Sequence, residues 1–90
     1  MARYQNIAAN STVAVSGGVG TLLRVVINKI GASSNTLILY DNTAASGDII
    51  ATIDTTIAGA PTREYDVTFR TGLTAVMGTG TAADVTVVTG

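Results

Sequence analysis

Short runs of alternating apolar and polar residues, separated by turn-forming residues, recur along the chain. The clearest example is Thr36–Asp54, in which the apolar runs Leu37–Tyr40 and Ile49–Ile53 flank a loop of Asp, Asn, Thr, Ser and Gly. Such loop residues bond their own backbone or accept left-handed conformations, so the stretch predicts a β-hairpin. Further strands are predicted at Thr12–Ser16, Thr21–Ile30, Arg63–Arg70, Leu73–Met77 and Asp84–Thr89.

Evenly spaced strands, Gly- and Asn-containing turns and the lack of a helical period predict an all-β fold. We expect a small antiparallel β-sandwich or barrel of seven to eight short strands. Residues 1–10 are predicted to form an N-terminal arm or an edge strand, and residues 11–90 a single β domain. A domain of 90 residues has a thin core, so neighbouring subunits can contribute to its stability.

Alternation along the two longest strands predicts which side chains face the core. In Thr21–Ile30 the inward set is predicted to be Leu23, Val25 and Ile27. The opposite face then carries Leu22, Arg24 and Val26. In Arg63–Arg70 the inward set is predicted to be Tyr65, Val67 and Phe69.

The chain carries few charges. Charged residues make up 12%, against about 25% in an average protein. Either Thr, Ser and Asn solvate a surface so poor in charge or much of it is covered in an assembly, and we expect the assembly. The five cationic residues are scattered and the net charge is −1, so no nucleic-acid partner is expected. No segment has the length or hydropathy of a signal peptide or membrane span, so we expect no membrane partner and synthesis in the cytoplasm.

Candidate chemistry is sparse, because the chain has no Cys and no His. Ser16–Thr21, SGGVGT, lacks the Lys and the following helix of a phosphate-binding loop, so a glycine-rich turn is expected. Asp41–Asp48 lacks the ligand spacing of a calcium loop and is interpreted as a turn. Arg63, Glu64 and Asp66, together with Arg70, could imitate an acid–base site, but a solvated or interface face explains them better. We therefore expect no enzymatic activity, no metal and no cofactor.

Three segments resemble small structural proteins encoded by tailed bacteriophages. They are Tyr40–Ile53, YDNTAASGDIIATI, then Thr68–Thr74, TFRTGLT, and Thr81–Val88, TAADVTVV. The resemblance implies a virion component that is made in the host cytoplasm and assembled onto the capsid exterior. It implies a capsid decoration or cement protein, often a homotrimer, that bridges and stabilises major capsid protein subunits without enzymatic activity.

Two alternatives remain open at this point. The domain could belong to the head–tail neck, the tail or a fibre, or it could be a host-surface or carbohydrate-binding β module. The absence of Trp argues against the carbohydrate module. Candidate trimer contacts are the outward-facing Leu22, Val26, Ile38 and Tyr40. The full set of candidate subunit or capsid contacts adds residues of the N-terminal segment and scattered arginines: Arg3, Tyr4, Ile7, Arg24, Arg63 and Arg70.

Overall fold

The computed structural model describes residues 2–58 and 62–90, and these residues form eight β-strands. The strands are β1 (Arg3–Ile7), β2 (Ser11–Ser16), β3 (Gly20–Lys29), β4 (Thr36–Tyr40), β5 (Ile49–Asp54), β6 (Thr62–Phe69), β7 (Leu73–Gly78) and β8 (Asp84–Thr89). Within the described ranges no helix has the length and apolar character needed to cross a membrane.

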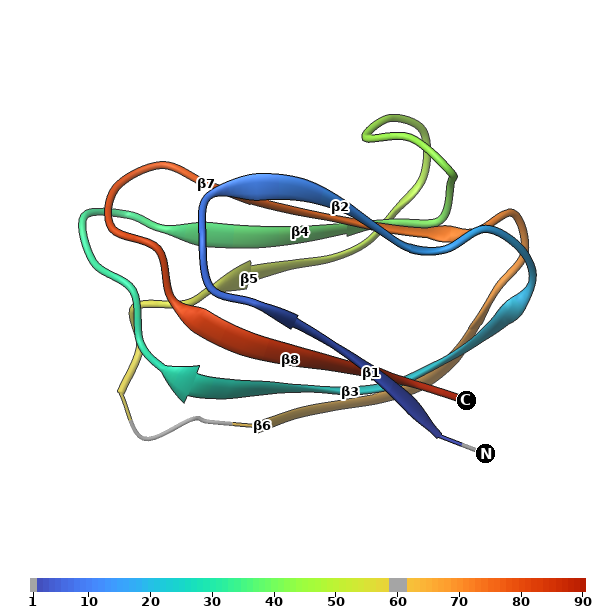
Figure 1. Ribbon diagram of the computed structural model, residues 1–90, viewed down its shortest axis with the longest axis horizontal. Helices are drawn as coiled ribbons and strands as arrows, with labels where there is room; N and C mark the ends of the chain where they lie inside the picture. Colours follow the sequence, from blue (N-terminus) through green and yellow to red (C-terminus); the bar gives the residue numbers. More distant parts are fainter. Residues whose placement is uncertain (1, 59–61) are drawn as a thin grey trace.

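The strands form two four-stranded antiparallel sheets that stack face to face (Figure 1). The first sheet has the order β1-β8-β3-β6 and the second the order β2-β7-β4-β5. Four of the strand pairs are those that one long hairpin would make: β1·β8, β2·β7, β3·β6 and β4·β5. Folding this hairpin over on itself brings β3 beside β8 and β4 beside β7. This arrangement is a jelly roll. The predicted all-β fold is confirmed, and it is a sandwich.

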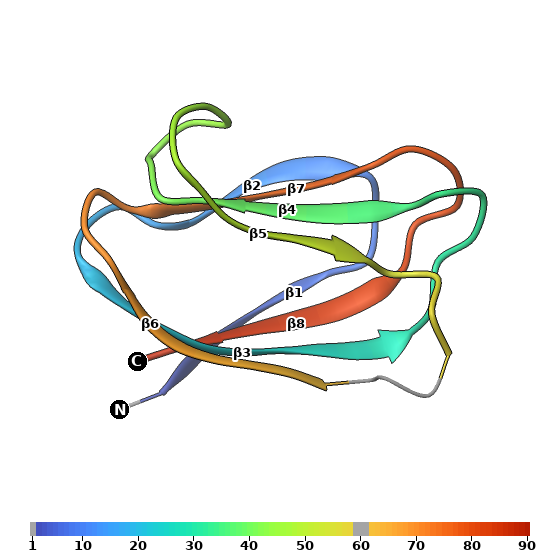
Figure 2. The same cartoon turned by 180° about the vertical axis from the view of Figure 1, so that it is seen from behind.

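The hairpin predicted at Thr36–Asp54 forms the tip of this long hairpin, and Figure 2 shows its loop from behind. Its two strands pair from Thr36 opposite Asp54 to Tyr40 opposite Ile49. The loop closes by a hydrogen bond of 2.8 Å from the Asp41 N–H to the Asp48 carbonyl. Leu37 and Leu39 point into the core, whereas Ile38 lies on the opposite face, as alternation predicts.

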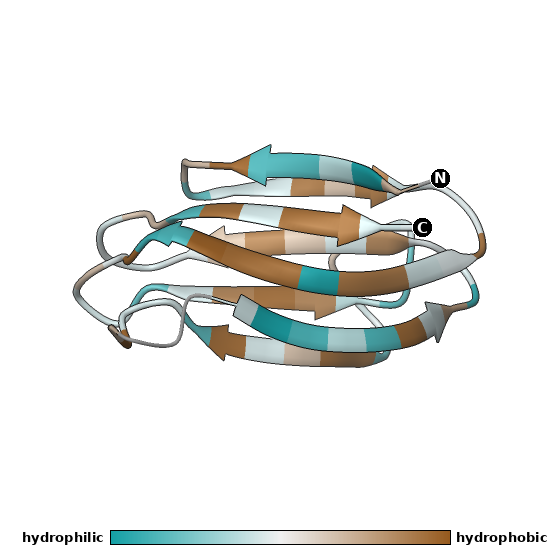
Figure 3. Cartoon of the chain, turned by 90° about the horizontal axis from the view of Figure 1, so that it is seen from below, coloured by the Kyte–Doolittle hydropathy of each residue, from teal (hydrophilic) through white to brown (hydrophobic). Residues whose placement is uncertain are grey.

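The core fills the space between the sheets and consists mainly of aliphatic side chains. Its largest fully buried members are Phe69, Leu22, Leu37, Leu39, Leu73, Met77, Val25, Val85 and Val87. In Figure 3, which faces the first sheet, apolar and polar segments alternate along the strands. Alternation of this kind is expected for antiparallel strands with one face buried and the other solvated.

The predicted faces of β3 are partly wrong, because a bulge interrupts its alternation. Its register shifts between Leu22 and Arg24 against both of its neighbours, β6 and β8. An extra residue in one strand moves the following side chains to the other face. Leu22 is therefore fully buried, although alternation placed it outside, and Leu23 is only half-buried, although alternation placed it inside. Val25 and Ile27 are buried as predicted.

The prediction that Val67 points into the core is also wrong. Phe69 is buried and Tyr65 packs against the core, but 38% of the Val67 surface is exposed. The strand β6 lies at the edge of the first sheet, and its backbone at Asp66 has a left-handed φ of 55°. The register shifts at the same point, so regular alternation is lost there.

A buried polar network joins the loops at one end of the sandwich. Asn35 is fully buried, and its side-chain amide donates to the Asn10 side chain at 2.9 Å and to the Thr79 carbonyl at 2.8 Å. Its side-chain oxygen accepts a hydrogen bond of 2.6 Å from the buried Thr55 hydroxyl. Buried polar groups that are satisfied in this way fix the relative positions of the segments they join.

At the other end, Asp41 joins the hairpin loop to the turn between β6 and β7. One carboxylate oxygen accepts hydrogen bonds of 2.9 Å from the backbone N–H groups of Arg70 and Thr71. The bond from Thr71, followed by that from Arg70, holds the pKa of Asp41 below its usual value. The loop thus acts as a turn that anchors a second turn.

Candidate interaction surfaces

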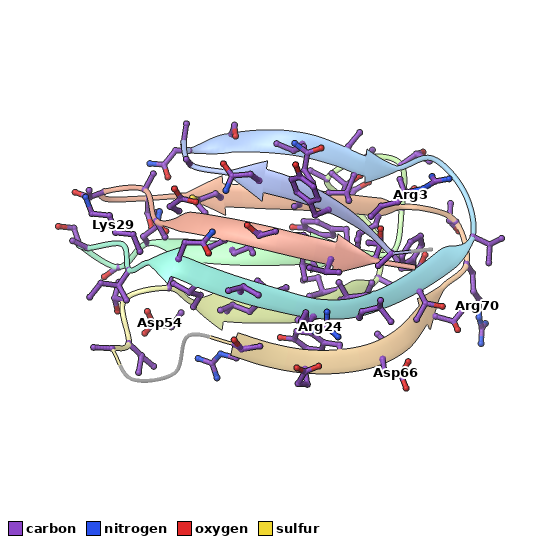
Figure 4. The ribbon with its side chains drawn as sticks, turned by 60° about the horizontal axis from the view of Figure 1, so that its bottom comes forward. Arg3, Arg24, Lys29, Asp54, Asp66 and Arg70 are labelled. Atoms are coloured by element: carbon purple, nitrogen blue, oxygen red, sulfur yellow. The ribbon has the colours of Figure 1, made fainter. Side chains whose placement is uncertain are left out.

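The two sheets differ sharply in charge. Of the eleven charged residues, five cationic and six anionic, seven lie on strands of the first sheet: Arg3, Arg24, Lys29, Arg63, Glu64, Asp66 and Asp84. Asp54, the last residue of β5, is the one charged residue in the four strands of the second sheet. Figure 4 shows Arg24 and Asp66 on the first sheet, which faces the viewer.

The central part of the outer side of the second sheet therefore presents a surface that we call the uncharged face. Strand register and alternation place two transverse rows of side chains on it, and a third outward-facing row, Gly78, Thr36 and the charged Asp54, borders it at the end away from the segment 41–48. One row runs Thr12, Val76, Ile38 and Thr52, and the other runs Ala14, Thr74, Tyr40 and Ile49. The apolar pair Val76 and Ile38 occupies the two central strands.

A raised loop borders the uncharged face at one end. Figures 1 and 2 show the segment 41–48 rising above the second sheet. Thr74 is buried, and its hydroxyl donates a hydrogen bond of 2.9 Å to the Asn42 carbonyl. The loop is thereby attached to the sheet and forms a ledge beside the face.

A second candidate surface is a groove of about 440 Å³ at the side where β1 and β2 lie. These two strands are the edges of their sheets, so each offers backbone groups that no neighbouring strand pairs. Phe69 and Thr89, both buried, contribute to the lining. Among the described residues, the lining consists of Arg3, Tyr4, Gln5, Val15, Ser16, Val19, Gly20, Phe69, Thr89 and Gly90.

This groove brings together two residues that the sequence analysis selected, Arg3 and Tyr4. Arg3 carries the one charged side chain that the described part of the chain contributes to the lining, and Tyr4 is 77% exposed. The sequence analysis missed Val19, which is 73% exposed and also lines the groove. A large apolar residue within the glycine-rich turn was the available signal. Exposed apolar side chains beside a cation suit an extended partner segment with both apolar and acidic groups.

The outer side of the first sheet carries two other selected residues, Arg24 and Val26. Arg24 Nε lies 3.4 Å from Glu64 Oε1, and both side chains are substantially exposed. An ion pair of this kind contributes little to stability. Val26 lies on the same face and is half-buried. These residues are accessible, but they stand among polar neighbours such as Asn28 and Thr86.

Two selected residues are not available for contact through their side chains. Ile7 is only 2% exposed, because the N-terminal segment is an edge strand paired with β8 and its last side chain enters the core. Leu22 is fully buried because of the bulge in β3. The proposed roles of Ile7 and Leu22 as subunit or capsid contacts are therefore corrected to core positions.

The remaining selected arginines lie apart from each other. Arg70 is exposed in the turn after β6, and Figure 4 shows it at the same end of the molecule as Arg3. Arg63 is half-buried and pairs in register with the core residue Val25, so it lies on the inner side of the edge strand β6. Its Nε is buried and has no hydrogen-bond partner among residues 2–58 and 62–90. The structure therefore does not gather the four residues Arg63, Glu64, Asp66 and Arg70 into one site.

Neither the placement of potential metal ligands nor the comparison with known proteins adds a further site. Among residues 2–58 and 62–90, no group of three or more His, Cys, Asp or Glu side chains is placed to hold a metal ion. Neither a protein-family model nor a curated protein gives a significant match to this chain.

Proposed function

We propose that this protein is a non-enzymatic virion structural protein, a capsid decoration or cement protein that bridges and stabilises major capsid protein subunits on the capsid exterior. The proposal starts from the resemblance of three segments to tailed-phage structural proteins. The jelly-roll fold is compatible with it, since viral capsid domains often have this fold. Lectins and cupins have it too, so the fold alone does not determine the function.

The observation that carries the proposal is the groove between the edge strands β1 and β2. It combines unpaired strand edges, the exposed side chains of Tyr4 and Val19, and a single cation, Arg3. An extended segment of the major capsid protein can pair with such an edge and place an apolar side chain in the groove. An acidic residue in that segment would face Arg3.

Repetition over the capsid explains how such a small contact can stabilise a particle. A protein that binds only the assembled shell shifts the equilibrium toward assembly by mass action. When one copy contacts two neighbouring capsid subunits, the first contact raises the effective concentration at which the second contact forms. Many weak contacts can then increase the temperature at which the particle opens.

The test uses particles that lack the protein, to which purified protein is added back before heating. Release of DNA is followed with a fluorescent dye, and binding is measured by co-sedimentation. We expect the added protein to bind and to raise the temperature of DNA release. Particles that bind the protein but release DNA at an unchanged temperature would contradict the cement function.

A matched pair of charge reversals tests the groove itself. Arg3→Glu reverses the groove cation and should weaken binding to particles. Lys29→Glu makes the same charge change at the opposite end of the molecule, where Figure 4 shows Lys29, and should bind as the parent protein does. Equal binding of the two variants would exclude the groove as the capsid contact.

A further inference from the structure

We propose that β1, and not β2, pairs with the partner segment at the groove, and that this segment carries an acidic and an aliphatic side chain two residues apart. The segment adds to the first sheet as a further strand beyond β1. It is taken to be part of the major capsid protein, so this assignment rests on the proposed function. The backbone at the edges of the two sheets distinguishes β1 from β2.

Of the four edge strands in the part of the chain that the structure describes, only β1 has an unbroken register. The extra residue of a bulge is Val15 in β2 and Ile50 in β5. In β6 the register shifts across Tyr65 and Asp66. Bulges in edge strands twist the edge away and hinder further pairing. A new strand can therefore pair with β1 with the least distortion.

Alternate residues of β1 direct their backbone groups to the open side. Gly90 directly follows β8 and exchanges backbone hydrogen bonds of 2.9 and 3.1 Å with Thr21 of β3. Because bonding alternates along an antiparallel strand, the residue before Gly90 directs its N–H and C=O to β1, where Arg3 is its register partner. The backbone groups of Tyr4 and Asn6 then point away from β8. These two residues offer the donors and acceptors for an added strand.

The side chains of the groove determine which segment fits. Ile7 enters the core, so alternation places Arg3 and Gln5 on the groove side of β1 as well. The residues of the added strand opposite these two positions share one face and enter the groove. A carboxylate opposite Arg3 complements its charge. The other inward side chain lies by the apolar lining from Val15 and Val19, which suits an aliphatic residue.

The strand β1 of a second copy is a poor partner for this edge. Its sequence, RYQNI, has no acidic residue to face Arg3 and brings a second cation to the same short interface. Pairing along its five residues extends over only about 17 Å, at about 3.4 Å per residue. Complementary side chains must add to so few backbone bonds, and charge complementarity therefore favours an acidic segment of another protein.

The test selects short random linear peptides on the full-length protein and measures the binding of enriched peptides by fluorescence polarisation. We expect enriched peptides to carry Asp or Glu two positions from Val, Ile or Leu. Tyr4→Pro removes the outward N–H and leaves the pairing with β8 intact, as proline does at edge positions. Tyr4→Ala removes the same side chain but keeps the N–H. Tyr4→Pro should bind about tenfold or more weakly than Tyr4→Ala, because a donor is lost and the ring obstructs the segment.

Ala14→Pro makes the same kind of backbone change on the edge strand β2 and should bind these peptides as the parent protein does. Hydrogen exchange of the parent protein provides a second measurement in case Tyr4→Pro does not fold. Bound peptide should slow exchange of the Tyr4 and Asn6 amides and leave that of Ala14 unchanged.

Four results would overturn the proposal: selection without the acidic and aliphatic pattern, equal binding by Tyr4→Pro and Tyr4→Ala, loss of binding in Ala14→Pro, or unchanged exchange at Tyr4 and Asn6. A parent dimer that Tyr4→Pro converts to a monomer would also overturn it, because a second copy would then occupy the edge. No particle is present in these experiments. Their failure would leave the cement function in place, whereas failure to bind particles would remove that function without changing the peptide result.

Discussion

Replacing Asn35 by Ala should be the most damaging single polar substitution in this fold. The Asn35 side chain is fully buried, and its amide donates to Asn10 and to the carbonyls of Gly78 and Thr79 at 2.8 to 3.2 Å. Alanine can make none of these bonds. The two carbonyl groups and the Ala83 N–H would then lose a partner, and the Thr55 hydroxyl would keep only the Asn35 backbone carbonyl, at a site that the described structure shields from water.

The magnitude follows from these bonds. An amide group has two N–H donors, and its oxygen accepts the Thr55 hydroxyl, so about three hydrogen bonds are lost at about 1 kcal/mol each. Desolvated acceptors that stay unpaired add to this loss, so we expect the free energy of unfolding to fall by about 3 kcal/mol or more. For a domain of this size that corresponds to a decrease in melting temperature of roughly 12 to 24 °C.

The assay is urea unfolding followed by circular dichroism, with Asn28→Ala as the matched control. Asn28 also donates two side-chain hydrogen bonds, to Asp84 at 3.2 Å and to Thr86 at 2.9 Å, but it lies on an exposed face. Its loss should cost less than about 1 kcal/mol, because water can replace the bonds. If the two variants were equally stable, the role assigned to the buried network would be refuted.

Three further predictions concern the core, a close contact and acid stability. Leu22→Ala should lower the free energy of unfolding by about 2 to 5 kcal/mol and Leu23→Ala by clearly less, measured by urea unfolding; the reverse order would contradict the bulge. Gly20→Ala would place a Cβ 2.7 Å from an aromatic ring carbon and should cost about 1 to 3 kcal/mol, whereas Gly78→Ala meets nothing within 4 Å and should be nearly neutral in thermal unfolding. The pKa of Asp41 is lowered in the folded state, so its stabilising effect is present above its ordinary value of 3.8 and is lost as the pH falls through the folded value. Stability measured against pH should therefore fall in acid less steeply for Asp41→Asn than for the parent protein, and identical slopes would contradict this role.

Local patterns in the sequence predict the strands well. The hairpin at Thr36–Asp54 combines two apolar runs with self-bonding loop residues, and its side chains alternate as expected. The last strand, Asp84–Thr89, is also found where its alternating pattern places it. These features depend on neighbouring residues in the chain, so the sequence contains the information directly.

The errors arise where distant segments decide the structure. The bulge in β3 exists only in relation to its partners β6 and β8, so nothing in the local sequence shows that Leu22 rather than Leu23 is buried. Ile7 enters the core because the N-terminal segment pairs with the last strand. Asn35 stands in a cluster of turn residues, and only the folded loops surround it with hydrogen-bond partners.

The candidate surfaces were only partly predictable from the sequence, because they also depend on strands that are distant in the chain. Ile38 and Tyr40 were selected by simple alternation and lie on the uncharged face. The face as a whole depends on the strand order, since β2, β4, β5 and β7 are scattered in the sequence and become neighbours only in the sheet. A count of charged residues in each predicted strand indicates which strands lack charge. Only the strand order shows that these strands lie side by side in one sheet.

The measurement that tests the proposed function most directly is a reconstruction of the phage particle to which the protein is proposed to belong, with a count of its copies. The proposed function predicts hundreds of copies on the capsid exterior, each with the groove between β1 and β2 against the major capsid protein. A dozen or fewer copies at the neck, tail or fibre, or complete absence from the particle, would contradict it.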